Sequence, residues 1–168
     1  MVLELAIVCL FPWAMALGGA MDLFTLTIPN RISVAMVAGF FLLAPFSGLG
    51  LDGILDHAGA GSAMLLMGIF MFAMGWLGGG DAKLFAAGAL WCGFDHLLEF
   101  VVYLTLAGGA VTMSILFYRT SIPHPWLLRQ PWALRLHDPA TGVPYGIALA
   151  IAALIIYPTM PWIAALNG

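Results

Sequence analysis

The sequence predicts an all-α, polytopic membrane protein with about six transmembrane helices in a single domain over residues 1–168. Two observations support this class. Of the 168 residues, 63% are hydrophobic and 8% are charged, whereas soluble domains have about 45–50% apolar and roughly 25% charged residues. The few charges also separate apolar runs that are long enough to span a membrane, about 17 to 25 residues. The composition therefore argues against a soluble enzyme, a disordered regulator or a nucleic-acid-binding protein.

The apolar runs define the expected helices in chain order. Five of the six uncharged stretches are long enough to span directly, and the fourth, 84–94, is short. That helix reaches full length if Lys83 extends its ammonium outward and Asp95 lies at the opposite interface. Continuous apolar runs of this kind argue against a β-barrel. The predicted spans are 3–21, 32–51, 59–77, 82–96, 98–118 and 145–164.

The basic residues predict the orientation of these spans. If successive loops alternate between the two sides, all five basic residues share one side, which by the positive-inside rule is cytoplasmic. Both termini are then outside. The N-terminus has no basic region, so a cleaved signal peptide is not expected. The basic residues are Arg31, Lys83, Arg119, Arg129 and Arg135.

The one long connection is the cytoplasmic segment 119–144, whose five prolines prevent a continuous helix. Trp126 and Trp132 alternate loosely with Arg129 and Arg135. This pattern suits a linker that lies in the headgroup layer and contacts membrane lipids. The alternative is that the segment forms a wall or a lid beside a site that faces the cytoplasm.

Two aspartates fall on the predicted cytoplasmic boundary. Asp22 ends the first span and is followed by a turn, because Pro29 disfavours helix at Ile28. Asp81 follows three glycines, Gly78 to Gly80, which allow close backbone approach and admit water. Each aspartate alone has a structural interpretation, as an interfacial helix end or as a helix cap.

Together the two aspartates suggest chemistry. Two carboxyls that are close together can share one proton, because ionising both is costly. One carboxylate then accepts a proton from water, which attacks a peptide carbonyl, while the other carboxyl protonates the carbonyl oxygen. This reaction needs no metal and no cofactor, and we expect neither. A metal site at Asp52, Asp56 and His57 is a weaker interpretation, because nearby glycines disfavour the helix that would align them.

These residues carry a resemblance. Asp22, followed after five residues by Ile28-Pro29-Asn30, resembles the first signature of type IV prepilin peptidases. Gly78-x-Gly80-Asp81-x-Lys83 resembles their second, the GxGD motif of intramembrane aspartic proteases. Pro144-Tyr145-Gly146 is similar to an element of the short subfamily that serves Flp/Tad-type pili.

The resemblance implies an endopeptidase of the bacterial cytoplasmic (inner) membrane, for pilus biogenesis and protein secretion, with Asp22 and Asp81 as the catalytic pair. Its substrates would be prepilins or pseudopilins, cut on the cytoplasmic side between a basic leader and a hydrophobic helix. Ile28, Pro29, Asn30, Gly78 and Gly80 would support the site, and Lys83 would be accessory or an interfacial anchor. The cysteine-bearing insertion of longer relatives is missing, which argues against N-methyltransferase activity. Two alternatives are a proton-coupled transporter or channel subunit that uses the same aspartates as a relay, and a non-catalytic pilus-assembly subunit.

Overall fold

The computed structural model describes residues 2–160, together with all their side chains except those of 2–7 and Leu128. The described part is helical and contains no strand. The α-helices are α1 (Val2–Thr25), α2 (Asn30–Leu43), α3 (Leu51–Ala73), α4 (Gly79–Thr120), α5 (Pro131–His137) and α6 (Tyr145–Ile156). The short 3-10 helices are η1 (Ala44–Phe46), η2 (Leu127–Arg129) and η3 (Tyr157–Thr159).

Three helices are long and apolar enough to cross a membrane: the part of α1 over Val8–Thr25, then α3 and α4. Two shorter apolar stretches, Asn30–Phe46 and Tyr145–Thr159, contain α2 and α6. Large apolar side chains such as Leu66, Leu98 and Phe117 lie exposed on the outside of the bundle. Such a surface is suited to lipid rather than water. The protein is therefore an all-α membrane protein.

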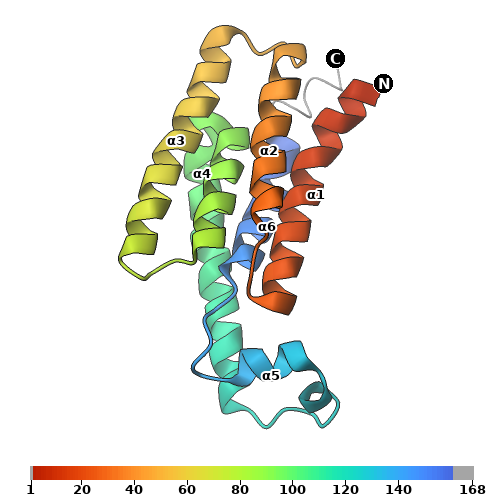
Figure 1. Cartoon of the computed structure of the whole chain (residues 1–168), viewed down its shortest axis with the longest axis vertical. Helices are drawn as coiled ribbons and strands as arrows, with labels where there is room; N and C mark the ends of the chain where they lie inside the picture. The colour runs from red at the N-terminus through yellow and green to blue at the C-terminus, as the bar shows by residue number, and fades with distance from the viewer. Residues whose placement is uncertain (1, 161–168) are drawn as a thin grey trace.

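Helix α4 reverses direction at Gly93. This residue has φ 65° and ψ 176°, a conformation that is almost restricted to glycine. As a result, Phe85 in the first half of α4 packs against Phe100 in the second half, with ring centroids 6.0 Å apart. A straight helix would hold these residues about 22 Å apart. The two halves of α4 are thus antiparallel neighbours, as Figure 1 shows.

The helices form a bundle whose centre contains α4 and α6 (Figure 1). Helix α6 packs against α1 and α4, and α3 lies along α4. Small residues such as Ala148, Ala152 and Ala153 are fully buried in α6, which allows close approach of its neighbours. Trp91 is fully buried beside Phe11 and Phe40, and its indole N–H donates to the carbonyl of Met36 at 3.0 Å.

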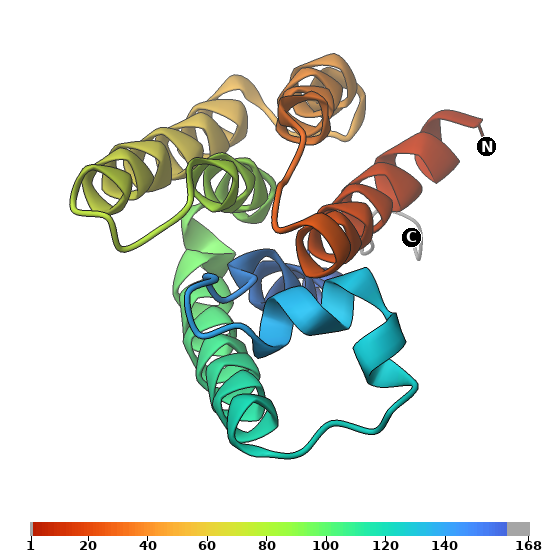
Figure 2. The same ribbon diagram turned by 60° about the horizontal axis from the view of Figure 1, so that its bottom comes forward.

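One end of the bundle, which we call the base, contains the end of α1, the start of α2 and both ends of α4 (Figure 1). Helix α5 lies across the base beside the end of α1, as Figure 2 shows. Trp132 packs edge-on against Phe24, with centroids 5.8 Å apart, and the Arg135 guanidinium donates to the carbonyl of Phe24. The segment after α4 is therefore packed onto the helices.

The helices differ in detail from the predicted spans. The structure breaks α4 at Gly93, slightly before the predicted boundary between 82–96 and 98–118, because one glycine turns the chain without a loop. The segment 119–144 contains η2 and α5, and Pro131 occupies the first turn of α5, where its missing N–H is not needed. All five basic residues belong to elements or helix ends at the base.

Candidate active site

Asp22 lies in the last turn of α1, buried to 4% exposure. Its backbone carbonyl accepts a hydrogen bond from the N–H of Leu26 at 2.8 Å. Leu26 adopts φ 53°, a left-handed conformation that ends the helix one turn after the aspartate. The chain leaves α1 at this point, so the Asp22 carboxyl faces the centre of the base.

Asp81 lies in the first turn of α4, where Gly78 precedes the helix in an extended conformation. It is 8% exposed. A Cβ at Gly78 would lie 2.7 Å from Asp81 Oδ2, so the missing side chain of Gly78 leaves room for this carboxyl. The helix N-terminus also favours a negative charge at this position.

The two aspartates line the same pocket, which has a volume of about 370 Å³. Oδ2 of Asp22 accepts a hydrogen bond from the backbone N–H of Gly146 at 2.7 Å. Among the described residues, no hydrogen bond reaches Oδ1 of Asp81, although this atom is buried. The pocket therefore holds one carboxyl that is fixed in place and another with an unused acceptor.

Ile28 lies between the two aspartate-bearing segments. A Cβ at Gly80 would lie 3.1 Å from Ile28 Cβ, and a Cβ at Gly146 would lie 2.9 Å from Ile28 Cδ1. Two glycines, one from α4 and one from α6, thus pack directly against this isoleucine. Pro29 precedes α2 in an extended conformation, with φ −62° and ψ 132°. These contacts explain why an Ile-Pro pair follows Asp22 at this spacing.

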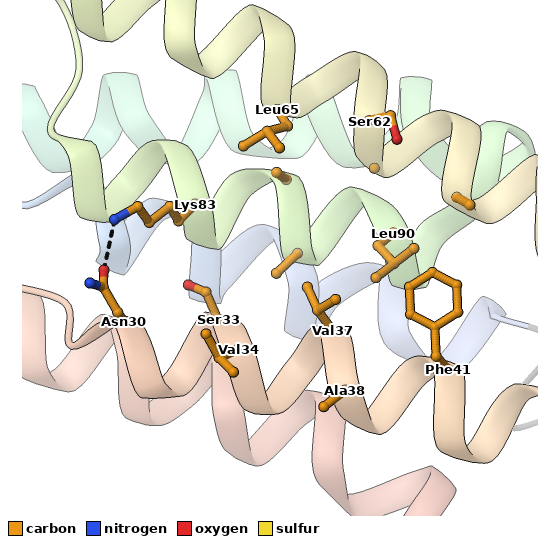
Figure 3. Close-up of a pocket in the computed structure, with 14 residues that line it drawn as sticks. Asn30, Ser33, Val34, Val37, Ala38, Phe41, Ser62, Leu65, Lys83 and Leu90 are labelled. Atoms are coloured by element: carbon orange, nitrogen blue, oxygen red, sulfur yellow. Dashed lines mark hydrogen bonds between the residues drawn. The ribbon is translucent and has the colours of Figure 1, made fainter.

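Asn30 and Lys83 link α2 to α4 at the base. The Lys83 ammonium donates to Asn30 Oδ1 at 2.8 Å, as Figure 3 shows. Lys83 is exposed, and it does not line the pocket that Asp22 and Asp81 share. Its contact is with the helix that follows the Ile-Pro-Asn sequence. This geometry fits a supporting residue.

The start of α6 completes the site. Gly146 must be glycine here, because a Cβ would meet Asp22 Cβ at 2.7 Å and Asp22 Oδ2 at 2.9 Å. The neighbouring Tyr145 lines the pocket, and Pro144 is fully buried before the helix. The Pro-Tyr-Gly sequence therefore brings a backbone N–H to the first aspartate.

The segment before α6 forms a wall of the pocket, through Gly142 and Val143. Arg119 holds this wall to the end of α4. Its Nε donates to the carbonyl of Leu136 at 2.9 Å, and its Nη2 donates to the carbonyls of Thr141 at 2.9 Å and Gly142 at 3.3 Å. The end of segment 119–144 thus borders the pocket, and α5 packs beside the end of α1.

Asp56 and His57, at the other end of the bundle, have structural partners. Asp56 Oδ2 accepts a hydrogen bond from the N–H of Phe94 at 3.0 Å, directly after the break at Gly93. The Nδ1 of His57 pairs with the carbonyl of Leu90 at 2.9 Å, and its ring stacks on Phe40. Within the part of the chain that is described, no three His, Cys, Asp or Glu residues gather as a metal site.

Sequence reasoning singled out both aspartates, but it missed several residues that line their pocket. The Gly146 N–H is the main omission as a site group, although Pro144-Tyr145-Gly146 was itself a visible signal. Trp76 and Leu77 precede the three glycines and also line the pocket. No pattern in the sequence distinguishes them from other apolar residues at a helix end. Leu26 likewise carries no signal for its left-handed backbone.

Comparison with known proteins identifies a family. A profile of the type IV leader peptidase family matches residues 9–113, well over half of the chain. The matched region contains Asp22, the Ile-Pro-Asn sequence and Asp81. Comparison with curated proteins and with solved structures gives no significant match.

Proposed function

Since the chain belongs to the type IV leader peptidase family, we propose that it is a membrane aspartic endopeptidase with Asp22 and Asp81 as its catalytic pair. The observation that carries this proposal is the shared pocket, in which both carboxyls are buried and one buried oxygen of Asp81 has no partner among the described residues. Membership of a peptidase family favours proteolysis over a proton relay or a purely structural assembly role.

The pocket supports direct attack by water. One carboxylate accepts a proton from water as the oxygen bonds to the peptide carbonyl carbon. The second carboxyl, protonated beforehand, donates its proton to the carbonyl oxygen, which gives a neutral tetrahedral intermediate. The C–N bond then breaks as the first carboxyl passes the proton that it took from water to the leaving nitrogen, while the second carboxylate takes a proton back from a hydroxyl of the intermediate. The Gly146 N–H holds Asp22 in position through this sequence, which limits the reorganisation that the reaction requires.

The proposed substrates are prepilin-like proteins with a basic leader and a hydrophobic segment, cut at the membrane boundary. The base carries Arg31, Lys83, Arg119, Arg129 and Arg135, which supports a cytoplasmic location for the pocket by the positive-inside rule. The same argument places both termini outside. Assignment to the Flp/Tad type stays a prediction that rests on Pro144-Tyr145-Gly146.

Replacement of the catalytic acids tests the proposal. The chain is co-expressed with a candidate prepilin, and loss of the leader is followed by mass spectrometry. We expect Asp22→Asn and Asp81→Asn each to slow cleavage by about 10²–10⁴-fold, because an amide can neither accept the proton of water nor donate one as an acid. Both variants keep the shape of the side chain, so they are expected to fold.

Asp138→Asn is the matched control. Asp138 is also at the base but does not line the pocket, and its Oδ1 accepts the N–H of Ala140 at 2.9 Å, a bond that an asparagine oxygen can keep. This variant should process the prepilin at the normal rate. Normal processing by either pocket variant, with the protein present in the membrane, would refute the catalytic pair.

A further inference from the structure

The bundle has two apolar grooves beside the candidate active site. The first, which we call the methionine groove, has a volume of about 760 Å³ and lies between α3 and the second half of α4. The second, the α2 groove, has about 600 Å³ and lies between α2 and α3 over the first half of α4 (Figure 3). Both are large enough to hold several side chains of another molecule.

The methionine groove adjoins the catalytic pocket. The two cavities share the lining residues Trp76, Leu77 and Tyr145, so they are neighbours at the base. The α2 groove shares no lining residue with the pocket, and its end at the base contains the Lys83–Asn30 pair. A chain that lies across Asp22 and Asp81 therefore enters the methionine groove without crossing another helix.

The groove has the shape to receive a helix. On α3 its lining residues Met64, Met67 and Met71 follow helical spacing, so they share one face. On α4 the lining extends from Val101 to Met113, about 18 Å or three turns. Two roughly parallel helical faces with a trough between them fit a third helix better than a compact ligand.

The residues that line the groove favour an apolar helix as its occupant. No charged residue lines it, and its only hydroxyl-bearing residues besides Tyr145 are Thr105 and Thr112. Methionine side chains adapt to varied apolar partners, which suits an enzyme with more than one substrate. On α4, which lines the groove across from the methionines, Gly109 is exposed. A small residue at this position lets another helix approach closely in a membrane.

We infer that the methionine groove binds the hydrophobic segment of the substrate as a helix, with the scissile bond held in the adjoining pocket. This inference rests on the proposed function, because it assumes a substrate whose hydrophobic segment begins next to the cleavage site. The groove then aligns the substrate along α3 and α4 and delivers its unwound end to Asp22 and Asp81.

Filling the groove at Gly109 tests the inference. A Cβ at Gly109 would meet no atom within 4 Å, so the side chain of Gly109→Leu starts in open space and adds bulk to the groove. Leucine also has a higher helix propensity than glycine, so folding is not expected to suffer. With a full-length prepilin in vesicles, we expect kcat/KM to fall roughly tenfold or more, as for an overfilled apolar site.

Two controls introduce leucine at other positions, where it replaces alanine. Ala110→Leu adds bulk to the next residue of α4, which is exposed but does not line the groove. Ala38→Leu fills the α2 groove instead. Both should process the prepilin within about twofold of the unmodified enzyme, since neither blocks the methionine groove. An unchanged rate for Gly109→Leu, or an equal loss for Ala38→Leu, would overturn the inference.

A crosslinking experiment gives an answer that does not depend on turnover. A photoreactive residue is introduced as Met113→benzoylphenylalanine or Ala38→benzoylphenylalanine, each combined with Asp81→Asn, in membranes that contain uncut prepilin. We expect an adduct with the prepilin from position 113 and none from position 38. An adduct between two copies of this chain, an adduct with lipid alone, or capture from position 38 would contradict the assignment.

The two experiments separate this inference from the proposed function. If Asp22→Asn and Asp81→Asn abolish processing while Gly109→Leu does not change it, the catalytic pair stands and the groove assignment fails. If the aspartate variants process normally, the proposed function fails whatever the crosslinks show.

Discussion

Each end of the bundle has an aspartate beside a glycine of α4, but the two aspartates have different partners. At each end a glycine lets α4 begin or turn, and an aspartate lies next to that glycine. At the far end, Asp56 Oδ2 accepts the N–H of Phe94, which the break at Gly93 leaves without a helical partner. At the base, Oδ1 of Asp81 has no partner among the described residues, and the carboxyl lines a pocket.

This difference shows how to separate a structural acid from a candidate catalytic one. A carboxylate beside a helix break is structural when its oxygen satisfies the amide that the break exposes. It is available for chemistry when a cavity lies in front of it and a buried oxygen is unused. Burial alone does not distinguish the ends, because His57 is as buried as the two base aspartates and pairs with Leu90.

Among the substitutions that compare the two ends of the bundle, Gly146→Ala is expected to have the largest effect. The added Cβ would lie 2.7 Å from Asp22 Cβ and 2.9 Å from its Oδ2, so the carboxyl must move away from the Gly146 N–H. We expect kcat to fall about 100-fold, because a displacement of about 1 Å at a catalytic group has this effect. The rate of prepilin cleavage by purified enzyme in detergent measures it.

Gly79→Ala serves as the comparison for Gly146→Ala. It lies between the motif glycines, and its Cβ would lie 3.4 Å from Phe72 Cε2, an ordinary contact. Its activity should stay near normal. Equal activity in the two variants would show that the Gly146–Asp22 contact is not needed for cleavage.

At the far end, Gly93→Ala should lower stability and leave chemistry intact. Alanine resists φ 65°, and its Cβ would lie 2.9 Å from His57 Nε2. We expect the free energy of unfolding to fall by about 1–3 kcal/mol, while the cleavage rate per folded molecule is unchanged. Reversible unfolding in detergent micelles measures the first quantity, and activity normalised to folded protein measures the second.

For Gly109→Ala we expect the opposite change in the free energy of unfolding. Gly109 lies within the same helix and has open space around it. This change is expected to raise the free energy of unfolding by up to about 1 kcal/mol. If Gly93→Ala and Gly109→Ala were equally stable, the turn of the chain at position 93 would not depend on glycine.

The smallest expected effect is at Lys83, which is at the base but outside the pocket. Lys83→Met removes the hydrogen bond to Asn30 Oδ1, and we expect a two- to tenfold fall in activity from the loss of one such bond. Asn30→Ala should have a similar effect. In the double variant the two losses should not add, because both remove the same contact. If Lys83→Met were as inactive as Asp81→Asn, Lys83 would instead take part in the reaction.

The sequence was sufficient for the class of protein, and it singled out the two aspartates that line one pocket in the structure. Charges are so scarce in this chain that their positions mark helix ends, and the two motifs stand at those ends. The element boundaries were harder. Asp95 and His96 suggested a break after residue 96, but the chain turns at Gly93, because backbone conformation rather than charge decides where a buried helix reverses.

Sequence patterns could not predict which residues form the walls of the pocket. Val143 and Trp76 meet only after α4 folds back and Arg119 holds the segment before α6. Contacts between distant segments depend on packing, which a periodicity in one segment does not encode. The link from Gly146 to Asp22, across 124 positions, is of this kind.

The turn at Gly93 has a consequence for how the protein is built. The two halves of α4 are joined without a loop, so the backbone groups that the turn exposes cannot be satisfied by residues of a connection. The N–H of Phe94 at the tip of this helical hairpin needs Asp56, which belongs to the helix made just before it. The residue that satisfies the turn is therefore synthesised before the hairpin that requires it.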